Sequence, residues 1–348
     1  YYRLNRAQDL EEFLSAMRLH ALPSINYTYA DKDGHIAFVY NARFPVRERG
    51  WDWSAYLPGD RSSLVWNSTA TFEDIPTLVD PMSGVVGNAN HFPFAATVGD
   101  ENLQPEDFPS EWGIEKRMTN RGHRFLELWG ADESITHDEM VAYKFDHSYS
   151  QRSETARVLR QLLALTPDSA PAGDARLEHA LSLLRQWDLD TQRQNRSAAL
   201  AVLSIQKILN GHGEAAEHLR ETLLDTYDEL VQHFGRADPS WGDVNRLTRG
   251  SVNLPVSGAP DVLRAIYGAV QDDGTLNATN GDGFMALVEW DQDGGRRAWG
   301  LHQYGAHVAD PSAKHATDQM QDFVDEELRP ILLTQEEINA AAQRTYSP

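Results

Sequence analysis

The sequence contains no cysteine among its 348 residues. This absence excludes disulfides, thiolate nucleophiles and zinc sites built on cysteine ligands. An exported protein that avoids stray thiol chemistry fits such a composition, and so do many cytosolic proteins. The lack of cysteine therefore excludes several kinds of chemistry, but it does not decide the cellular compartment.

Positive charge is also scarce. Lysine and arginine together number 31, against 52 aspartates and glutamates, so the formal net charge is −21. A chain with this balance repels phosphate backbones and anionic lipid head groups unless a local basic patch intervenes. The sequence shows no such patch, and we expect neither a nucleic acid nor a membrane surface as a partner.

Long apolar runs are missing too. No stretch approaches the roughly 18 apolar residues that a membrane-spanning helix needs. No charged start followed by an apolar segment marks an export signal within these residues. What is present is 41% hydrophobic residues, enough for a substantial core in one large or two ordinary domains.

Apolar periodicity predicts a helix near the start of the chain and a strand pair near each end. Leu10, Phe13, Leu14 and Met17 fall on one helix face. Residues 25–30 and 35–40 are rich in β-branched and aromatic side chains and flank a turn that ends in glycine, and the same pattern recurs at 284–290 and 298–304. The two hairpins predict an antiparallel sheet built from both.

The middle of the chain, from about residue 114 to 234, has helical spacing of its leucines. Thr136 with Glu139, and Thr334 with Glu337, have the spacing of capping boxes. A loop is expected over residues 166–173. The chain is therefore predicted to be α+β, with three segments in order along the sequence. They are a sheet-forming segment at 1–113, a mainly helical segment at 114–240, and returning strands with C-terminal helices at 241–348.

Two asparagines, Asn88 and Asn90, end the stretch that begins at Asp80, and Phe92 and Phe94 follow them. Acyl transfer places negative charge on the former carbonyl oxygen, and an asparagine NH2 group held nearby stabilises that charge. Asparagine also tolerates the left-handed backbone of a turn. The residue types alone leave both interpretations open.

The stretch from Asp80 to Phe94 resembles the oxyanion-hole segment of the penicillin acylase family. Further blocks resemble that family in the same order along nearly the whole chain. They are the segments 21–34, 38–47, 57–60, 304–306 and 315–319. Together they are most similar to the branch that contains acyl-homoserine-lactone acylases and related long-chain acylases.

The resemblance implies part of an N-terminal nucleophile hydrolase, an αββα sandwich with a largely helical insertion. Such enzymes mature by self-cleavage of a zymogen, and a serine at the start of the β-subunit attacks the amide with its own α-amino group as base. This chain begins with Tyr1, so we expect the serine to lie upstream. The implied partners are the α-subunit and the upstream part of the β-subunit, in the periplasm or outside the cell.

The resemblance also assigns roles to residues of this chain. Asn90 would hold the oxyanion, and Arg124, or failing that Arg121, would supply positive charge beside it. A solvated helix arginine is the alternative for either one. Phe92 and Phe94 would approach an apolar acyl pocket, unless they are plain core.

The implied function is hydrolysis of an N-acyl group from a small amine such as an N-acyl homoserine lactone, an activity that would quench quorum signals. The alternatives are an acylase acting on the side chains of β-lactam antibiotics, a metal-dependent amidase that uses late histidines, and a non-catalytic binding protein that keeps the fold.

Metal chemistry has little support in the sequence. His302, His307, Asp310 and the segment 315–319 match no zinc spacing. Asp100 or Glu101 falls near the place of one calcium ligand of the family, but the other ligands would lie upstream. We therefore expect no metal site in this chain and no organic cofactor.

Overall fold

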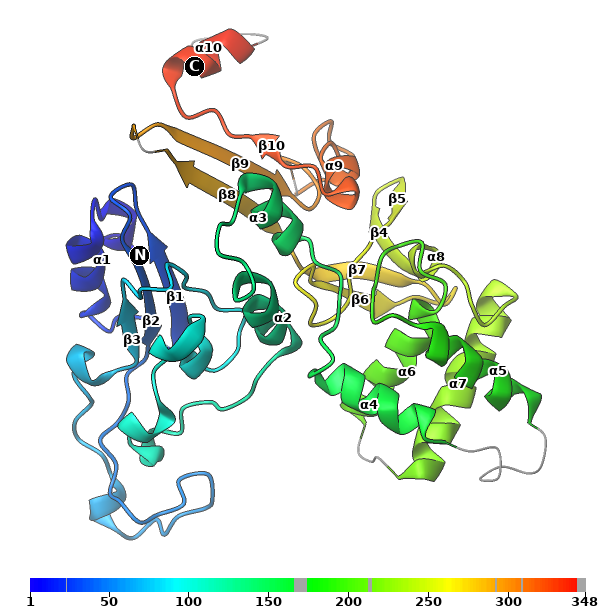
Figure 1. Ribbon diagram of the computed structural model, residues 1–348, viewed down its shortest axis with the longest axis horizontal. Coiled ribbons are helices and arrows are strands. Elements are labelled where there is room, and N and C mark those ends of the chain that lie inside the picture. The colour runs from blue at the N-terminus through cyan, green and yellow to red at the C-terminus, as the bar shows by residue number, and fades with distance from the viewer. Residues whose placement is uncertain (23, 166–173, 212–214, 292, 308, 343–348) are drawn as a thin grey trace. The chain divides into compact units, whose positions relative to one another are not determined.

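The computed structural model describes residues 1–22, 24–165, 174–211, 215–291, 293–307 and 309–342 (Figure 1). The chain divides into two compact units, Tyr1–Ile135 and Thr136–Pro348, and each is described by itself. The loop expected at 166–173 lies outside the described residues. None of the helices in the described ranges combines the length and apolarity needed to cross a membrane.

Unit 1 contains a three-stranded sheet in the order β1-β2-β3 (Figure 1). The predicted hairpin is confirmed as β1 (Ile25–Ala30) and β2 (Ile36–Asn41), which pair antiparallel. Gly34 has φ 88°, the left-handed backbone that the connecting turn requires. The short strand β3 (Thr77–Val79) pairs antiparallel with the other edge of β2.

Helix α1 (Leu10–Met17) follows the predicted apolar stripe. Its N-cap is Asp9, whose side chain accepts a hydrogen bond from the Glu12 backbone N–H. Phe13 and Met17 are buried with Val39 of β2 in one hydrophobic cluster.

The remaining helical elements of unit 1 are six 3-10 turns between β2 and residue 112, an initial 3-10 turn, and α2 (Asn120–Trp129). The 3-10 turns are η1 (Leu4–Arg6), η2 (Ser62–Leu64), η3 (Phe72–Asp74), η4 (Pro93–Ala95), η5 (Gly99–Glu101), η6 (Pro105–Asp107) and η7 (Ser110–Trp112).

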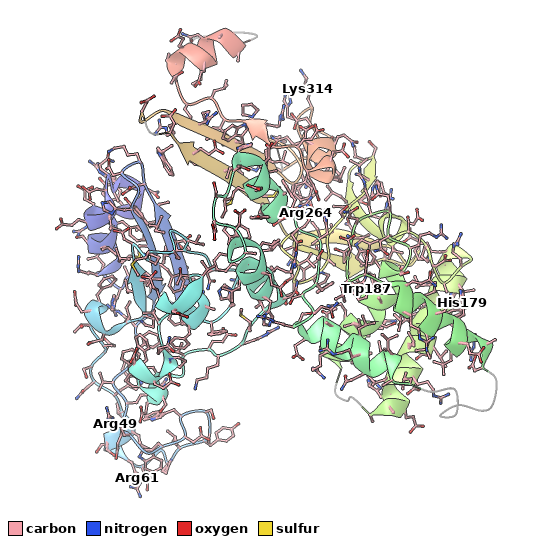
Figure 2. All side chains as sticks on the ribbon, in the orientation of Figure 1. Arg49, Arg61, His179, Trp187, Arg264 and Lys314 are labelled. Atoms are coloured by element: carbon pink, nitrogen blue, oxygen red, sulfur yellow. The ribbon has the colours of Figure 1, made fainter. Side chains whose placement is uncertain are left out.

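A long loop joins β2 to β3 and is closed at its base by an antiparallel bridge between Pro45 and Thr69. Inside the loop, the Arg61 guanidinium lies over the Trp51 ring at 5.4 Å from its centroid. Figure 2 shows Arg61 at the far end of this loop. Such cation–π contacts give an irregular segment some fixed structure of its own.

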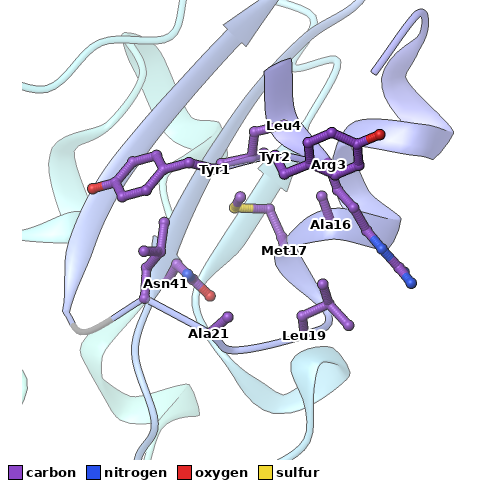
Figure 3. A pocket seen from close by; sticks show the side chains of 10 residues that line it. Tyr1, Tyr2, Arg3, Leu4, Ala16, Met17, Leu19, Ala21 and Asn41 are labelled. Atoms are coloured by element: carbon purple, nitrogen blue, oxygen red, sulfur yellow. The ribbon is translucent and has the colours of Figure 1, made fainter. Parts of the chain in front are cut away.

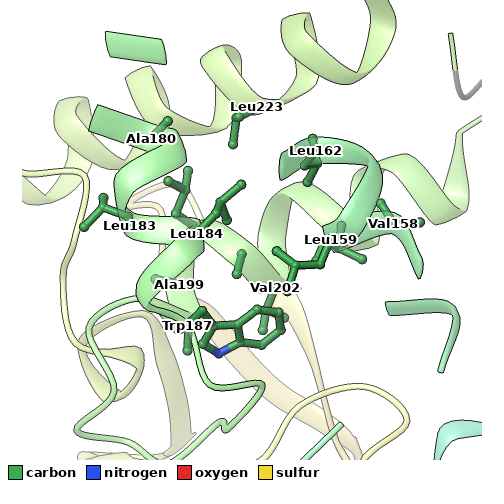
Figure 4. Close-up of a cluster of buried hydrophobic side chains, with 14 of the residues drawn as sticks. Val158, Leu159, Leu162, Ala180, Leu183, Leu184, Trp187, Ala199, Val202 and Leu223 are labelled. Atoms are coloured by element: carbon green, nitrogen blue, oxygen red, sulfur yellow. The ribbon is translucent and has the colours of Figure 1, made fainter. Parts of the chain in front are cut away.

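Unit 2 opens with the helices that the leucine spacing predicted. They are α3 (His137–Lys144), α4 (Glu154–Leu163), α5 (Ala175–Gln186), α6 (Ala198–Asn210), α7 (Ala216–Phe234) and the short α8 (Trp241–Val244). The capping box of Thr136 and Glu139 is present at the start of α3. Leu162, Leu184 and Leu223, from three different helices, meet in a buried cluster with Trp187 (Figure 4). Burial of these apolar side chains stabilises the helical part of unit 2.

Two sheets complete unit 2. One has the order β5-β4-β7-β6, in which β4 and β7 are parallel and the other neighbours antiparallel. The second has the order β10-β9-β8 and contains the predicted late hairpin. The bounds are β4 (Asn245–Arg249), β5 (Val252–Pro255), β6 (Ile266–Val270), β7 (Leu276–Gly281), β8 (Phe284–Trp290), β9 (Arg296–His302) and β10 (Arg329–Pro330), with helices α9 (Met320–Asp325) and α10 (Gln335–Ala341). The capping box of Thr334 and Glu337 begins α10.

The prediction of one sheet built from both hairpins is wrong for the strands described. The early hairpin belongs to a sheet of unit 1 and the late hairpin to a sheet of unit 2. In each case the second neighbour belongs to the same unit: β3 joins β2, and β10 joins β9.

A buried arginine organises charges inside unit 2. Arg264, labelled in Figure 2, has no exposed side-chain surface. Its guanidinium pairs with Asp282 at 3.0 Å and with Glu326 at 3.1 Å. A third bond goes to the Phe323 carbonyl at 2.6 Å. Lys144 also donates to Asp282, at 2.8 Å. Each buried charge thus has partners, which a low-dielectric interior requires.

Candidate functional site

The segment from Gly87 to His91 lies directly against helix α2. A Cβ atom on Gly87 would lie 2.5 Å from the Phe125 ring, and one on Gly122 would lie 2.8 Å from the His91 ring. Distances this short exclude a methyl group at either position without movement. The two glycines therefore set how closely the segment approaches the helix.

His91 is the buried support of this segment, with 2% of its surface exposed. Its Nδ1 accepts the Ala89 backbone N–H at 3.2 Å, so Nε2 carries the proton and donates to the Ala95 carbonyl at 2.9 Å. Its ring stacks on Phe125 at 6.0 Å between centroids. Burial lowers the pKa of His91 below its ordinary value of 6.5. A neutral imidazole thus fixes the backbone before Asn90, a role that sequence reasoning missed.

Asn88 and Asn90 have different roles. The Asn88 side chain donates to the His91 carbonyl at 2.9 Å and accepts the Asn90 backbone N–H at 2.9 Å. Asn90 has φ 60° and is exposed. The left-handed turn interpretation therefore describes the backbone of Asn90. The exposed amide of Asn90 is also available for the oxyanion interpretation.

Of the two candidate arginines, Arg121 contacts Asn90. Its Nη1 donates to Asn90 Oδ1 at 3.0 Å. Arg124, which the resemblance put first, donates to Glu127 at 2.8 Å along its own helix. Thr119 begins the helix by accepting the Gly122 N–H at 3.0 Å, and its hydroxyl also donates to the Ala89 carbonyl at 3.2 Å. The helix start and the Asn90 turn are therefore tied to each other.

The two phenylalanines differ in burial. Phe94 is 8% exposed, and its ring lies 5.8 Å from that of Phe108. Phe92 is half-buried and lies 6.1 Å from Phe94. Its backbone N–H donates to the Arg117 carbonyl at 3.1 Å. The core interpretation suits Phe94, and Phe92, which is less buried, is the better candidate to touch a ligand.

Glu101 and His315, two of the residues considered for metals, have other partners. Within the described parts of the chain, no three His, Asp or Glu side chains group closely enough to hold a metal ion. Glu101 accepts the Ser83 backbone N–H at 3.1 Å, and His315 pairs with Asp318 at 3.0 Å. Asp100 is exposed.

Comparisons with known proteins support the resemblance. The family model described as "Penicillin amidase" matches residues 1–340. An acyl-homoserine lactone acylase PvdQ of Pseudomonas fluorescens (strain Pf0-1) is 31% identical over 135 residues, which is 37% of this chain and 17% of that protein. The penicillin G acylase of Escherichia coli is 25% identical over 222 residues, covering 63% of this chain and 20% of that protein.

A third relative aligns over almost the whole chain. The acyl-homoserine lactone acylase PvdQ of Pseudomonas syringae pv. syringae (strain B728a) is 22% identical over 98% of this chain, and the chain spans 49% of that relative's length. Among solved structures, a thermostable penicillin G acylase from Alcaligenes faecalis matches 99% of this chain and 71% of that chain, with a TM-score of 0.59 and 16% identity. This structural likeness agrees with the predicted α+β fold. The chain belongs to the penicillin amidase family.

Proposed function

We propose that the protein containing this chain is an acylase that hydrolyses the amide of an N-acylated small amine. The observation that carries the proposal is the exposed Asn90 amide, with Arg121 bonded to its oxygen, in a segment that resembles the family's oxyanion hole. Family membership and acylase relatives support it.

The contacts around Asn90 explain how it would act. The bond from Arg121 to Oδ1 selects the amide orientation that leaves the NH2 group as the donor. A guanidinium on that oxygen also polarises the amide, which strengthens its N–H groups as donors. Asn88 and neutral His91 hold the turn in place, so a negative oxyanion meets donors that are already oriented.

The remaining catalytic parts are proposed to come from outside these residues. A serine that begins the processed β-subunit would attack the carbonyl, with its α-amino group accepting the hydroxyl proton. That amine has an ordinary pKa of about 8, which suits a base near neutral pH. Water would then release the acid. The chemistry uses no organic cofactor, and the proposed partners are the α-subunit and the upstream β-segment of one precursor in the periplasm or outside the cell.

An N-acyl homoserine lactone is the proposed substrate. The acyl-homoserine lactone acylases among the relatives support this choice. The side chain of Phe92, which is only partly buried, offers an apolar contact for an acyl chain. A penicillin-type side-chain amide is the second candidate, because the E. coli penicillin G acylase aligns over 63% of the chain.

The test replaces Asn90 in the complete, matured protein. Asn90→Leu is expected to lower kcat by about 10² to 10³, as loss of one oxyanion donor does. Because φ is 60° at this position, Asn90→Gly serves beside it, since glycine keeps the turn without strain and still removes the amide. Asn67→Leu, at another exposed asparagine, is the matched control. Undiminished turnover in both Asn90 variants would sink the proposal.

A further inference from the structure

The stretch of chain that leads into the Asn90 turn is bonded to residues 95–97, which we call the support segment. The Thr97 hydroxyl donates to the Val85 carbonyl at 2.7 Å. The Gly87 N–H donates to a carbonyl of the support segment at 2.8 Å. The buried imidazole beside Asn90 donates to a second carbonyl of the support segment at 2.9 Å. Three hydrogen bonds therefore fix this stretch from behind.

The Thr97 hydroxyl contributes more than one of the contacts. Thr97 is 0% exposed. Its single proton goes to the Val85 carbonyl, so the 2.6 Å contact with Ser83 Oγ requires the serine to donate to Thr97. The Ser83 oxygen accepts the Val85 N–H at 3.2 Å. One hydroxyl, used both as donor and as acceptor, thus holds the two ends of the Ser83–Val85 turn.

Thr97 is itself held on both sides of its backbone. Asn102 Oδ1 accepts the Thr97 N–H at 3.0 Å, and Asn102 Nδ2 donates to the Thr97 carbonyl at 2.9 Å. The two residues before Thr97 in the support segment are buried. A residue fixed in this way moves little, so the Val85 carbonyl is bonded to a rigid point of unit 1.

We propose that Thr97 is a positioning residue for the hydrolysis proposed above. It holds the stretch before Asn90 in place and so sets where the Asn90 amide lies. This role rests on the proposed function, because Thr97 influences turnover only if Asn90 holds the oxyanion. Donors stabilise an oxyanion best when they are fixed before the charge develops, and misplacing a reacting group by about 1 Å costs up to about 100-fold in rate.

The test removes and then restores the hydroxyl in the complete, matured protein, with whichever of the two candidate substrates the parent hydrolyses. Thr97→Val nearly keeps the shape of the side chain and should lower kcat by about 10-fold to 100-fold. The KM should stay close to that of the parent, because an oxyanion donor acts in the transition state. Thr97→Ser keeps the hydroxyl and should recover most of the lost kcat.

Two control variants separate positioning from loss of stability. Thr191 is also 0% exposed, and its hydroxyl donates to the His147 carbonyl at 2.7 Å in unit 2. Met17 lines a cavity of about 290 Å³ beside helix α1 (Figure 3) and is buried in the cluster of α1 and β2. Thr191→Val and Met17→Ala should lower the melting temperature and leave kcat near the parent value at temperatures where both variants are folded.

A double-mutant cycle shows whether Thr97 acts through Asn90. Once Asn90→Gly has removed the amide, adding Thr97→Val should lower kcat by less than about twofold, because coupled residues are not additive. Two unrelated effects would multiply instead.

Hydrogen exchange followed by mass spectrometry measures the same role without any substrate. Peptides covering residues 83–91 should exchange faster in Thr97→Val than in the parent, because the bonds of the Gly87 and Ala89 N–H groups open more often. Thr97→Ser and Thr191→Val should exchange like the parent in these peptides.

Parent-like kcat or exchange in Thr97→Val, an equal loss in Thr97→Ser, or a full loss added by Thr97→Val to Asn90→Gly would each overturn the role of Thr97 alone. Parent-like turnover in Asn90→Gly is a different result. It would overturn the proposed function and, with it, any part that Thr97 plays in the reaction.

Discussion

At the scale of single residues, the geometry separates two arginines that the sequence treats almost alike. Arg121 donates to Asn90, while Arg124 pairs with Glu127 on the same helix. If support of the Asn90 amide matters for catalysis, Arg121→Gln in the matured protein should lower kcat by roughly 10-fold to 100-fold, part of what a full oxyanion donor contributes. Arg124→Gln should cost less than Arg121→Gln. Steady-state kinetics on both variants measures the difference.

Arg121→Lys refines this comparison. Lysine keeps the charge but loses the planar fork that orients an amide oxygen, so it should recover only part of the lost kcat. A larger loss in Arg124→Gln than in Arg121→Gln would show that charge near the site matters more than the contact with Asn90, and it would restore the order that the sequence resemblance suggested.

His91 gives a prediction about pH. Its pKa is lowered by burial in the folded protein, from an ordinary 6.5. Below that value the unfolded chain binds a proton that the folded chain resists, so the free energy of unfolding should be steady above about pH 7 and decrease as the pH falls through about 6 toward 5. Urea unfolding at a series of pH values measures this.

His91→Gln is the comparison for that series, because glutamine is polar and does not titrate. Its stability should be lower overall, since the two bonds of the imidazole are disturbed, but the decrease between about pH 7 and 5 should be smaller. An identical slope in both proteins would show that other groups cause the loss at acidic pH.

At the scale of elements, the contact between the Asn90 segment and α2 depends on Gly122. In an ordinary helix position, glycine to alanine stabilises by up to about 1 kcal/mol. Here the added methyl would lie 2.8 Å from the His91 ring, so Gly122→Ala should instead destabilise by about 1 to 3 kcal/mol. Thermal unfolding measures the sign, and turnover should fall with it because Asn90 is displaced.

Gly59→Ala serves as the control for this change, because a Cβ atom at Gly59 would meet nothing within 4 Å. That variant should keep the parent's midpoint and activity. If Gly122→Ala raised the melting temperature, the segment would have to be held in place by something other than close contact with the helix.

Elements with strong periodicity were predictable from the sequence. Helix α1 and both hairpins have the residues expected for them, because each repeats its apolar pattern over six or more residues. The short strands β3 and β10 have three and two residues, too few for a pattern. Because β3 pairs with β2 and β10 pairs with β9, the two hairpins belong to separate sheets. The prediction of a shared sheet was wrong because these short strands could not be recognised in the sequence.

The candidate site was predictable only in part, because much of its support comes from contacts between residues far apart in the sequence. Asn90 could be named because its neighbours in sequence resemble a known segment. The close contacts of the two glycines join residues 31 and 38 positions apart, Gly122 with His91 and Phe125 with Gly87. Contacts between residues this far apart produce no regular pattern in the sequence. The choice between Arg121 and Arg124 likewise depended on a long-range contact, the bond from Arg121 to Asn90.

At the scale of the whole molecule, each unit has its own hydrophobic core. Unit 2 contains two buried clusters and the charge network around Arg264. A fragment spanning Thr136–Pro348 should therefore fold alone. We expect dispersed amide resonances in its NMR spectrum and a cooperative thermal transition. The same fragment with Leu223→Asp, which puts a charge in the core, should show neither. A parent fragment without a transition would contradict the independence of this unit.

The close approach of the Asn90 segment to α2 has a consequence for protein engineering. Gly87 and Gly122 set how closely the Asn90 segment approaches α2, and we expect a side chain added at either position to shift Asn90. Libraries intended to change which acyl groups are accepted should diversify Phe92 and leave both glycines unchanged. Otherwise, a misplaced amide would be mistaken for a change of selectivity.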